Sequence, residues 1–343
     1  MKTILIPELR KVEIVETPMP SRKEGEALLK ILCGGICGSD LGTYRGTFAY
    51  SSFPRIPGHE FAAEIVEVDP LNKYGLKPGM IVTGNPYFNC GKCYSCQRGL
   101  FNCCEHNETL GAQRDGAFSE FITLPLERIY EGQGLSAPIL TLIEPFCISY
   151  HGTVIRGKTA PGDKVLVVGA GTIGVFAAIA AKASGASVFI CDVAKSKVEY
   201  ALANFDLDGG FVNEGDEIFK EKCLSITDNK GFDVVIEAVG LPQTFQSCIN
   251  AAAFGGRVVL IGIGKRPLDF NFTVIQKKEL NVFGSRNALK QDFLTLIDLV
   301  NKGKVKIDKM ITNTYAFEEA SLAFDELDKN GGKNLKIQLD FTR

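Results

Sequence analysis

The chain has 343 residues, a length typical of two domains rather than one small core. Hydrophobic residues make up 45% of the sequence and charged residues 23%, which are the proportions of an ordinary globular protein. The net charge of -2, without any run of basic residues, gives no electrostatic sign of a nucleic-acid or membrane-surface binder, so we expect neither kind of partner.

The sequence shows no sign of export or membrane insertion. Residues 1–7 lack the apolar stretch and the small-residue cleavage site of a signal peptide. The longest apolar stretch, residues 175–181, is far shorter than the roughly 20 residues of a membrane helix. We therefore expect a cytoplasmic protein. Its 11 cysteines are then expected to be metal ligands or catalytic groups more often than disulfides.

The N-terminal part of the chain, residues 1 to about 150, has the pattern of irregular β structure. Short β-rich runs, such as residues 12–15 and 27–32, alternate with clusters of Gly, Pro and Cys. Helical periodicity is scarce there. This region is predicted to form a β-rich domain.

A second pattern begins near residue 161, where strands and helices alternate. The expected elements are strand 164–168, helix 172–184, strand 187–191, and later strands at 232–236, 257–261 and 280–283. Nearly continuous apolar strands separated by helices predict a doubly wound parallel sheet covered on both faces. The tail is expected to add helices at 292–301 and 318–328 and a last strand at 335–341.

Residues 169–174 read Gly-Ala-Gly-Thr-Ile-Gly and fit G-x-G-x-x-G between a strand and a helix. Gly169 allows the tight turn, Gly171 lets the backbone approach a pyrophosphate, and Gly174 lets the helix pack on the strand. The helix that opens at Thr172 and Ile173 offers free N–H groups to the phosphates. The pattern predicts a dinucleotide site.

Asp192 ends the next strand, where an acidic residue binds the adenosine ribose hydroxyls and repels a 2′-phosphate. NAD is therefore favoured over NADP, although Lys195 and Lys197 weaken the charge argument. The alternative is a plain strand-to-helix turn followed by a surface aspartate.

Four cysteines form Cys-x-x-Cys-x-x-Cys-x7-Cys on one short loop: Cys90, Cys93, Cys96 and Cys104. Four thiolates surround a tetrahedral Zn²⁺ and leave no open position, which predicts a structural zinc site. The alternative is a set of free thiols or a redox pair, an oxidation hazard at this density. Cys103 fits the spacing less well and is expected to point away.

A second, dispersed set of metal-ligand residue types precedes and follows this loop. Cys37 lies in Gly-Ile-Cys-Gly-Ser-Asp, His59 and Glu60 in Pro-Gly-His-Glu, and Glu144 in Ile-Glu-Pro. A catalytic zinc takes about three mixed protein ligands and one exchangeable position. Taken singly, His59 is equally well a structural histidine and Cys37 a buried small hydrophobe.

These motifs and the glycine loop occur in the order found in the zinc-containing medium-chain dehydrogenases, and the resemblance spans essentially the whole chain. The chain resembles the sorbitol, threonine and sugar-acid dehydrogenase branch most. The resemblance implies a GroES-like catalytic domain of residues 1–150, to which residues 287–343 return, and a Rossmann domain of residues 151–286. It also implies an NAD-using enzyme that holds two zinc ions per chain and forms dimers or tetramers.

The resemblance assigns roles at the dispersed set. Cys37, His59 and Glu144 correspond to the catalytic zinc ligands, and Glu60 to a ligand that exchanges with water or substrate. Asp40 corresponds to the partner that orients the ligand histidine, and Ser39 to the hydroxyl that takes the substrate proton. The resemblance further implies that the cofactor-contacting residues include Ala238, Val239, Ile261, Ser285 and Arg286.

Two positions depart from the family pattern. Gly42 stands where many relatives carry the histidine that ends the proton relay, so the relay is expected to use cofactor hydroxyls, water or another side chain. Ala63 replaces the usual glycine after Gly-His-Glu, a change that we expect the fold to tolerate.

The substrate is expected to be a small polyhydroxylated molecule. Residues 284–288 (Gly-Ser-Arg-Asn-Ala) resemble L-galactonate and L-gulonate 5-dehydrogenases, and the planar fork of Arg286 suits a carboxylate or vicinal hydroxyls. A sugar acid is therefore the first hypothesis, although Arg286 serves equally well in an interdomain or cofactor contact. Arg114 is a second anion-binding candidate. The alternatives are a neutral polyol dehydrogenase, a threonine dehydrogenase and a non-catalytic NAD-binding regulator.

Overall fold

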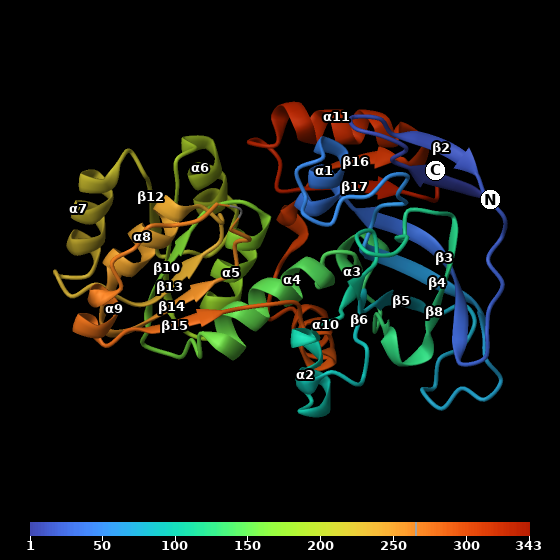
Figure 1. The fold of residues 1–343 in the computed structure, drawn as a ribbon, viewed down its shortest axis with the longest axis horizontal. Coiled ribbons are helices and arrows are strands. Elements are labelled where there is room, and N and C mark those ends of the chain that lie inside the picture. The colour runs from blue at the N-terminus through green and yellow to red at the C-terminus, as the bar shows by residue number, and fades with distance from the viewer. Residues whose placement is uncertain (265) are drawn as a thin grey trace. The chain divides into compact units, whose positions relative to one another are not determined.

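The computed structural model describes residues 1–264 and 266–343, which divide into two compact units. The first unit combines Met1–Glu144 with Leu289–Arg343, and the second is Pro145–Ala288. Both chain ends therefore lie in the first unit (Figure 1). The chain passes from the first unit to the second after residue 144 and returns after residue 288, where the sequence suggested 150 and 286. In the part of the chain described, no helix combines the length and apolar character that crossing a bilayer requires.

The described part of the second unit is built on a parallel sheet with the strand order β12-β11-β10-β13-β14-β15. Its strands are β10 (Lys164–Val168), β11 (Ser187–Asp192), β12 (Gly209–Val212), β13 (Phe232–Glu237), β14 (Ala252–Leu260) and β15 (Asn281–Gly284). The first strand is central and the chain proceeds outward in both directions, which is the order of the dinucleotide-binding fold. The predicted doubly wound sheet is thus confirmed.

Helices connect these strands and cover the sheet (Figure 1). They are α5 (Thr172–Ala183), α6 (Lys195–Asn204), α7 (Asp216–Ile226), α8 (Pro242–Ala251) and α9 (Thr273–Lys278), and a π-helical segment, η3 (His151–Arg156), precedes β10. Helix α5 forms because it is rich in alanine, the residue with the highest helix propensity. Gly185 follows its end with a positive φ of 84°, which glycine adopts at little cost.

Two strands of this sheet differ from the expectation. Strand β12 was not expected, because two of its four residues are glycines, which contribute little β propensity. Strand β14 begins at Ala252 rather than Arg257, and its register against β13 shifts between Phe232 and Val234. The first half of β14 contains Gly255 and Gly256. Because glycine is uncommon inside strands, the sequence did not predict this part of the strand.

The first unit is β-rich, as predicted. Its main sheet has the order β16-β17-β3-β4-β5-β9, with β8 also paired to β3. The strands are β3 (Glu26–Gly35), β4 (Glu60–Val68), β5 (Ile81–Gly84), β8 (Phe121–Pro125), β9 (Ile129–Glu131), β16 (Ile311–Ala316) and β17 (Lys336–Asp340). Two small sheets pair β1 (Lys2–Leu5) with β2 (Glu13–Glu16), and β6 (Tyr87–Phe88) with β7 (Glu108–Thr109).

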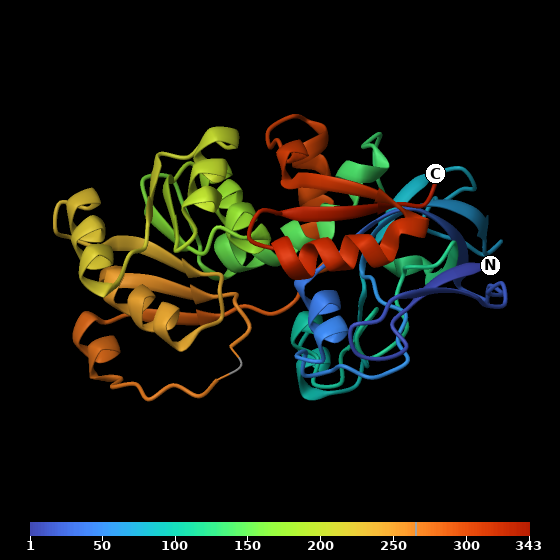
Figure 2. The ribbon, with the colours of Figure 1, turned by 90° about the horizontal axis from the view of Figure 1, so that it is seen from above.

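The C-terminal segment completes the first unit. Strand β17 pairs antiparallel with β3, with Leu339 opposite Gly34. Figure 2 shows the two strands β16 and β17, in red, beside helix α11 (Ala320–Asn330). Residues near the end of the chain thereby reach the strand that leads directly to Cys37.

The first unit also contains the helices α1 (Gly38–Arg45), α2 (Tyr94–Gln97), α3 (Ala137–Leu140) and α10 (Lys290–Asn301). Helix α4 (Ile143–Tyr150) includes residue 144, after which the chain enters the second unit. Helix α1 begins directly after Cys37, and α2 directly after Cys93.

Replacing Gly174 by alanine is expected to destabilise the second unit, because an added Cβ would lie 1.7 Å from the Gly169 carbonyl oxygen. Overpacking of this kind costs about 1–3 kcal/mol of unfolding free energy, which denaturant titration measures. The control is Gly284→Ala, where a Cβ meets no atom within 4 Å. Equal unfolding midpoints for the two variants would contradict the proposed close packing.

Candidate metal centres and cofactor site

Three of the dispersed residues form a compact group in the first unit. One ligand atom each from Cys37, His59 and Glu60 lies within 4.8 Å of the other two. Gly35 at the end of β3 pairs with Glu60 at the start of β4, so the residues that flank these strand ends are brought together. The sheet register therefore builds the group.

The Asp40 carboxylate ties the two segments of this group to one another. Asp40 is 2% exposed, and its two oxygens accept the N–H groups of Cys37 at 2.9 Å and Gly58 at 3.0 Å. His59 Nδ1 lies 3.8 Å from Asp40 Oδ1, which is longer than a hydrogen bond. Asp40 therefore orients His59 mainly through its hydrogen bond with the N–H of Gly58, the residue before His59.

Glu144 lies in the same buried surroundings but is not among the three grouped ligands. It is 2% exposed, and its Oε1 accepts a hydrogen bond from the Tyr87 hydroxyl. Burial raises the pKa of Glu144 to about 7, while the charge of His59 opposes that rise and the charge of Glu60 adds to it. Glu144 is thus close enough to interact electrostatically with the group.

Lys336 was missed by the sequence reasoning. It is 2% exposed, and its Nζ lies 2.7 Å from both Glu60 oxygens. It also donates to the Ile36 carbonyl at 3.2 Å. Although burial lowers the pKa of Lys336, the charges of Glu60 and Cys37 raise it overall. The sequence offered no clear signal, because Lys336 begins a strand in which polar and apolar residues alternate.

The donor set of this mixed site fits a zinc ion. A thiol, an imidazole and carboxylates are the ligand types of catalytic zinc sites. Burial lowers the pKa of His59, yet the acidic Asp40, Cys37 and Glu144 raise it well above its usual value, so the site is strongly attractive to a cation.

Ser39 and Gly42 lie on α1, beside the mixed site. Ser39 is half-buried in the first turn. A Cβ at Gly42 would lie 3.0 Å from the Cβ of Phe48. Any side chain at position 42 would therefore press on Phe48.

The four loop cysteines form a second group in the first unit. One sulfur atom each from Cys90, Cys93, Cys96 and Cys104 lies within 4.8 Å of the others. Backbone N–H groups of Cys96 and Glu105 lower the pKa of Cys93 to about 6, which favours the metal-binding thiolate. This closed set of sulfurs fits a structural zinc. Cys103 is half-buried and is not a member of the group.

In the second unit, the predicted cofactor residues lie at one edge of the sheet. They follow or end β10 (Gly169, Gly171, Thr172, Ile173, Gly174), β11 (Asp192), β13 (Ala238, Val239), β14 (Ile261) and β15 (Ser285, Arg286). Parallel strands present their carboxyl ends at the same edge, where open α/β sheets bind ligands. Arg286 is exposed there.

The glycine loop has the form that a pyrophosphate requires. Gly169 has a φ of 107°, and a Cβ at Gly171 would meet no atom within 4 Å, so the backbone is open to a ligand. Asp192 accepts the N–H of Ala170 at 2.8 Å and that of Ala194 at 2.9 Å. Asp192 thus also fixes the glycine loop, a role that the sequence did not indicate.

Glu237 is another residue that the sequence reasoning missed. This 2% exposed carboxylate accepts the N–H groups of Val239 at 3.0 Å and Gly240 at 2.9 Å, and the Thr244 hydroxyl at 2.6 Å. It therefore shapes the turn that carries Ala238 and Val239. The sequence signal for this role was an acidic residue at the end of a mainly apolar strand.

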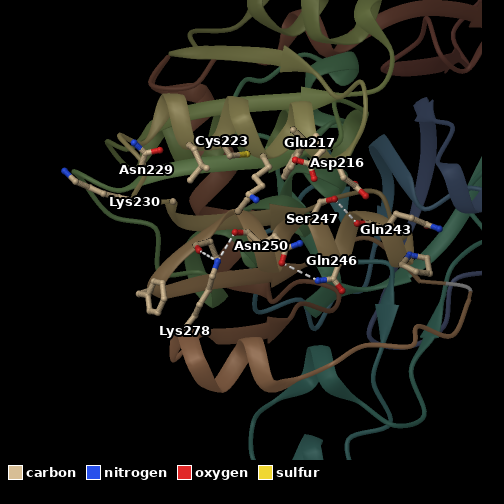
Figure 3. A pocket seen from close by; sticks show the side chains of 18 of the residues that line it. Asp216, Glu217, Cys223, Asn229, Lys230, Gln243, Gln246, Ser247, Asn250 and Lys278 are labelled. Carbon is tan, nitrogen blue, oxygen red and sulfur yellow. Dashed lines mark hydrogen bonds between the residues drawn. The ribbon is translucent and has the colours of Figure 1, made fainter.

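Two other features lie apart from these sites. Arg114, an anion-binding candidate, packs its guanidinium 3.8 Å from the Phe88 ring centroid and lies 3.6 Å from Glu108. A pocket of about 780 Å³ lies along α7 and α8 (Figure 3). Its lining, among the residues described, includes none of the predicted site residues.

Replacing Lys336 by methionine is expected to lower the free energy of unfolding by about 3–5 kcal/mol, because it leaves Glu60 buried without its cation. Denaturant titration measures the change. Lys329→Met is the matched control, since its pairing with Asp325 is largely exposed and worth less than about 1 kcal/mol. Equal losses of unfolding free energy in the two variants would show that the buried pair stabilises the fold no more than an exposed pair does.

Comparisons with known proteins agree with this arrangement. The alcohol dehydrogenase GroES-like domain family matches residues 23–133, and the zinc-binding dehydrogenase family matches residues 172–302. The chain is 37% identical to L-galactonate-5-dehydrogenase of Escherichia coli (strain K12), over 88% of this chain and 87% of that one. It is 34% identical to L-threonine 3-dehydrogenase of Pyrococcus furiosus, over 95% and 94%.

A solved structure gives the same result for the fold. The alcohol dehydrogenase rspB from Escherichia coli CFT073, complexed with NADH, matches with a TM-score of 0.90 and 30% identity over 99% of both chains. The chain therefore belongs to the zinc-dependent medium-chain alcohol dehydrogenase family, with a GroES-like unit and a Rossmann-type unit.

Proposed function

We propose that this dehydrogenase oxidises a secondary alcohol of a sugar acid, of the L-galactonate or L-gulonate type, to a ketone with NAD⁺. The observation that carries the reaction class is the buried group of Cys37, His59 and Glu60, with Glu144 beside it. In this proposal Cys37, His59 and Glu144 hold the catalytic zinc, and Glu60 is the exchanging ligand.

The metal and the cofactor each supply one part of the chemistry. A zinc ion held by Cys37, His59 and Glu144 would supply Lewis-acid polarisation of a hydroxyl oxygen, and an NAD⁺ bound at the glycine loop would supply a hydride acceptor. Four thiolates in the other group hold a structural zinc, which stabilises the loop and leaves no position for substrate.

The chain's own residues handle the proton. Ser39 accepts the substrate hydroxyl proton from its place in the first turn of α1. Since Gly42 has no side chain to receive it, the proton then leaves through a cofactor hydroxyl, water or another side chain. Lys336 holds both oxygens of Glu60, and so it opposes permanent ligation by that carboxylate.

The cofactor edge supports NAD rather than NADP. Asp192 is held at the end of β11 by two backbone N–H groups, so its negative charge stays where a 2′-phosphate would have to sit. The glycine loop leaves room for the pyrophosphate at Gly171.

Two observations support a sugar acid as substrate. The exposed Arg286 follows β15, and its planar fork suits a carboxylate. A relative of 37% identity is named L-galactonate-5-dehydrogenase. Another relative, 34% identical to this chain, is named L-threonine 3-dehydrogenase, so threonine is an alternative substrate. A neutral polyol is the other alternative.

Replacing Cys37 by serine is expected to lower turnover below about 1% of wild type, since loss of even an outer partner of a metal costs 10–100-fold. The mixed site should lose its zinc, measured per chain by elemental analysis, while NADH fluorescence titration shows unchanged cofactor binding. Cys33→Ser, at a buried thiol outside the group, is the control that keeps both zinc ions. Normal turnover in Cys37→Ser would refute the metal assignment.

A substrate panel separates the sugar-acid reading from its alternatives. NADH formation is measured with aldonates, the corresponding neutral alditols and threonine, for wild type and Arg286→Met. We expect an aldonate to give the highest kcat/KM, and Arg286→Met to raise the KM for the aldonate more than the KM for the corresponding alditol. Equal alditol and aldonate turnover would favour a polyol dehydrogenase. Tight NAD binding without turnover of any substrate would favour a non-catalytic regulator.

A further inference from the structure

One buried contact of the first unit is not used by the proposed reaction. The hydroxyl of Tyr87, on β6, donates to Glu144 Oε1, and the two residues are 7% and 2% exposed. We propose that Tyr87 is a positioning residue that holds the Glu144 carboxylate for the catalytic zinc, and that contacts from the four-cysteine loop hold Tyr87. This proposal rests on the proposed function, in which Glu144 is a zinc ligand.

The hydroxyl of Tyr87 can fix Glu144 without competing for its whole carboxylate. An ionised carboxylate has two oxygens and several acceptor sites, so one hydrogen bond orients the group and leaves the other oxygen for a cation. The charged groups that interact with Glu144 are His59, Glu60 and Lys336. A buried carboxylate that is also a metal ligand is usually oriented by such an outer partner.

Tyr87 itself is fixed on both sides of its backbone. Its N–H donates to Asn85 Oδ1 at 2.9 Å, and its carbonyl accepts a hydrogen bond from the Arg128 guanidinium. Tyr87 also pairs with Thr109 across the small β6–β7 sheet. These contacts fix the backbone of Tyr87, and its ring is buried.

Arg128 connects Tyr87 with the next residues of the chain. Its guanidinium lies 4.4 Å from the centroid of the Phe88 ring, and that of Arg114 lies 3.8 Å from it. Such cation–π contacts contribute about 0.5–2 kcal/mol each. The second nitrogen of Arg128 donates to Asn89 Oδ1 at 3.0 Å.

The same Asn89 side chain contacts the four-cysteine group. Its Nδ2 lies 4.0 Å from Cys96 Sγ, and the N–H of the following Cys90 donates to Cys104 Sγ at 3.2 Å. A continuous series of contacts thus leads from the sulfurs through Asn89, Arg128 and Tyr87 to Glu144. The ordered four-cysteine loop thereby helps to set the position of a catalytic ligand.

The test is Tyr87→Phe, which removes the hydroxyl and keeps the ring. We expect zinc affinity at the mixed site to fall about 10–100-fold, with the four-cysteine zinc retained and the melting temperature lowered no more than in the control. Competition titration with a chromophoric zinc chelator measures the affinity of each site. Tyr44→Phe is the matched control, because Tyr44 is another buried tyrosine, 5% exposed, that donates to a carboxylate, Asp325, at 2.9 Å.

Two results would overturn the proposal. In the first, Tyr87→Phe and Tyr44→Phe bind zinc like wild type. In the second, Tyr87→Phe loses both zinc ions and melts earlier, which would make the tyrosine a general structural residue. If wild type itself holds one zinc and Cys37→Ser does not change that content, the proposed function fails instead.

Asn89→Ala tests the link to the four-cysteine loop. We expect a several-fold loss of zinc affinity at the mixed site, in the same direction as Tyr87→Phe and smaller. An Asn89→Ala protein with wild-type affinity at the mixed site would overturn the link, even where Tyr87→Phe behaves as proposed.

Discussion

The buried contact between the Lys336 ammonium group and the Glu60 carboxylate joins three distant parts of the chain at the mixed site. Lys336 belongs to the last strand, Glu60 begins β4, and the Ile36 carbonyl that also contacts Lys336 directly precedes Cys37. A buried carboxylate is costly unless a cation accompanies it. The return of the C-terminal segment to β3 therefore does more than complete a sheet, because it supplies the positive charge that accompanies the buried Glu60 carboxylate.

The two groups of metal-ligand residues differ as catalytic and structural zinc sites differ. The mixed site brings thiol, imidazole and carboxylate together from separate segments, and Asp40 holds two of these segments by accepting their backbone N–H groups. The four-cysteine site comes from one short loop and uses sulfur alone. Hydrogen bonds through Tyr87, Arg128 and Asn89 run from that loop to Glu144, and on our proposal they couple the order of the loop to the orientation of this carboxylate.

Local patterns in the sequence predicted much of this structure. The glycine loop, the acid at the end of the next strand and the four-cysteine spacing each depend on neighbours in the chain, and the doubly wound sheet followed from the apolar periodicity. Lys336, Tyr87 and Glu237 could not be assigned in this way, because their roles depend on contacts that form only after folding. Lys336 and Glu60 are 276 positions apart, and no periodic pattern connects them. Strand β12 was missed because glycines make up half of it, and its pairing with β11 depends on the backbone alone.

We propose that Cys37, His59 and Glu144 hold a zinc ion distinct from the one in the four-cysteine loop. Anomalous X-ray diffraction at the zinc absorption edge, from crystals of the zinc-loaded protein, tests it most directly. The predicted result is two anomalous peaks per chain, one surrounded by the four cysteine sulfurs and one within bonding distance of Cys37, His59 and Glu144. A single peak in the four-cysteine loop, or a second peak that does not contact Cys37 and His59, would contradict the claim.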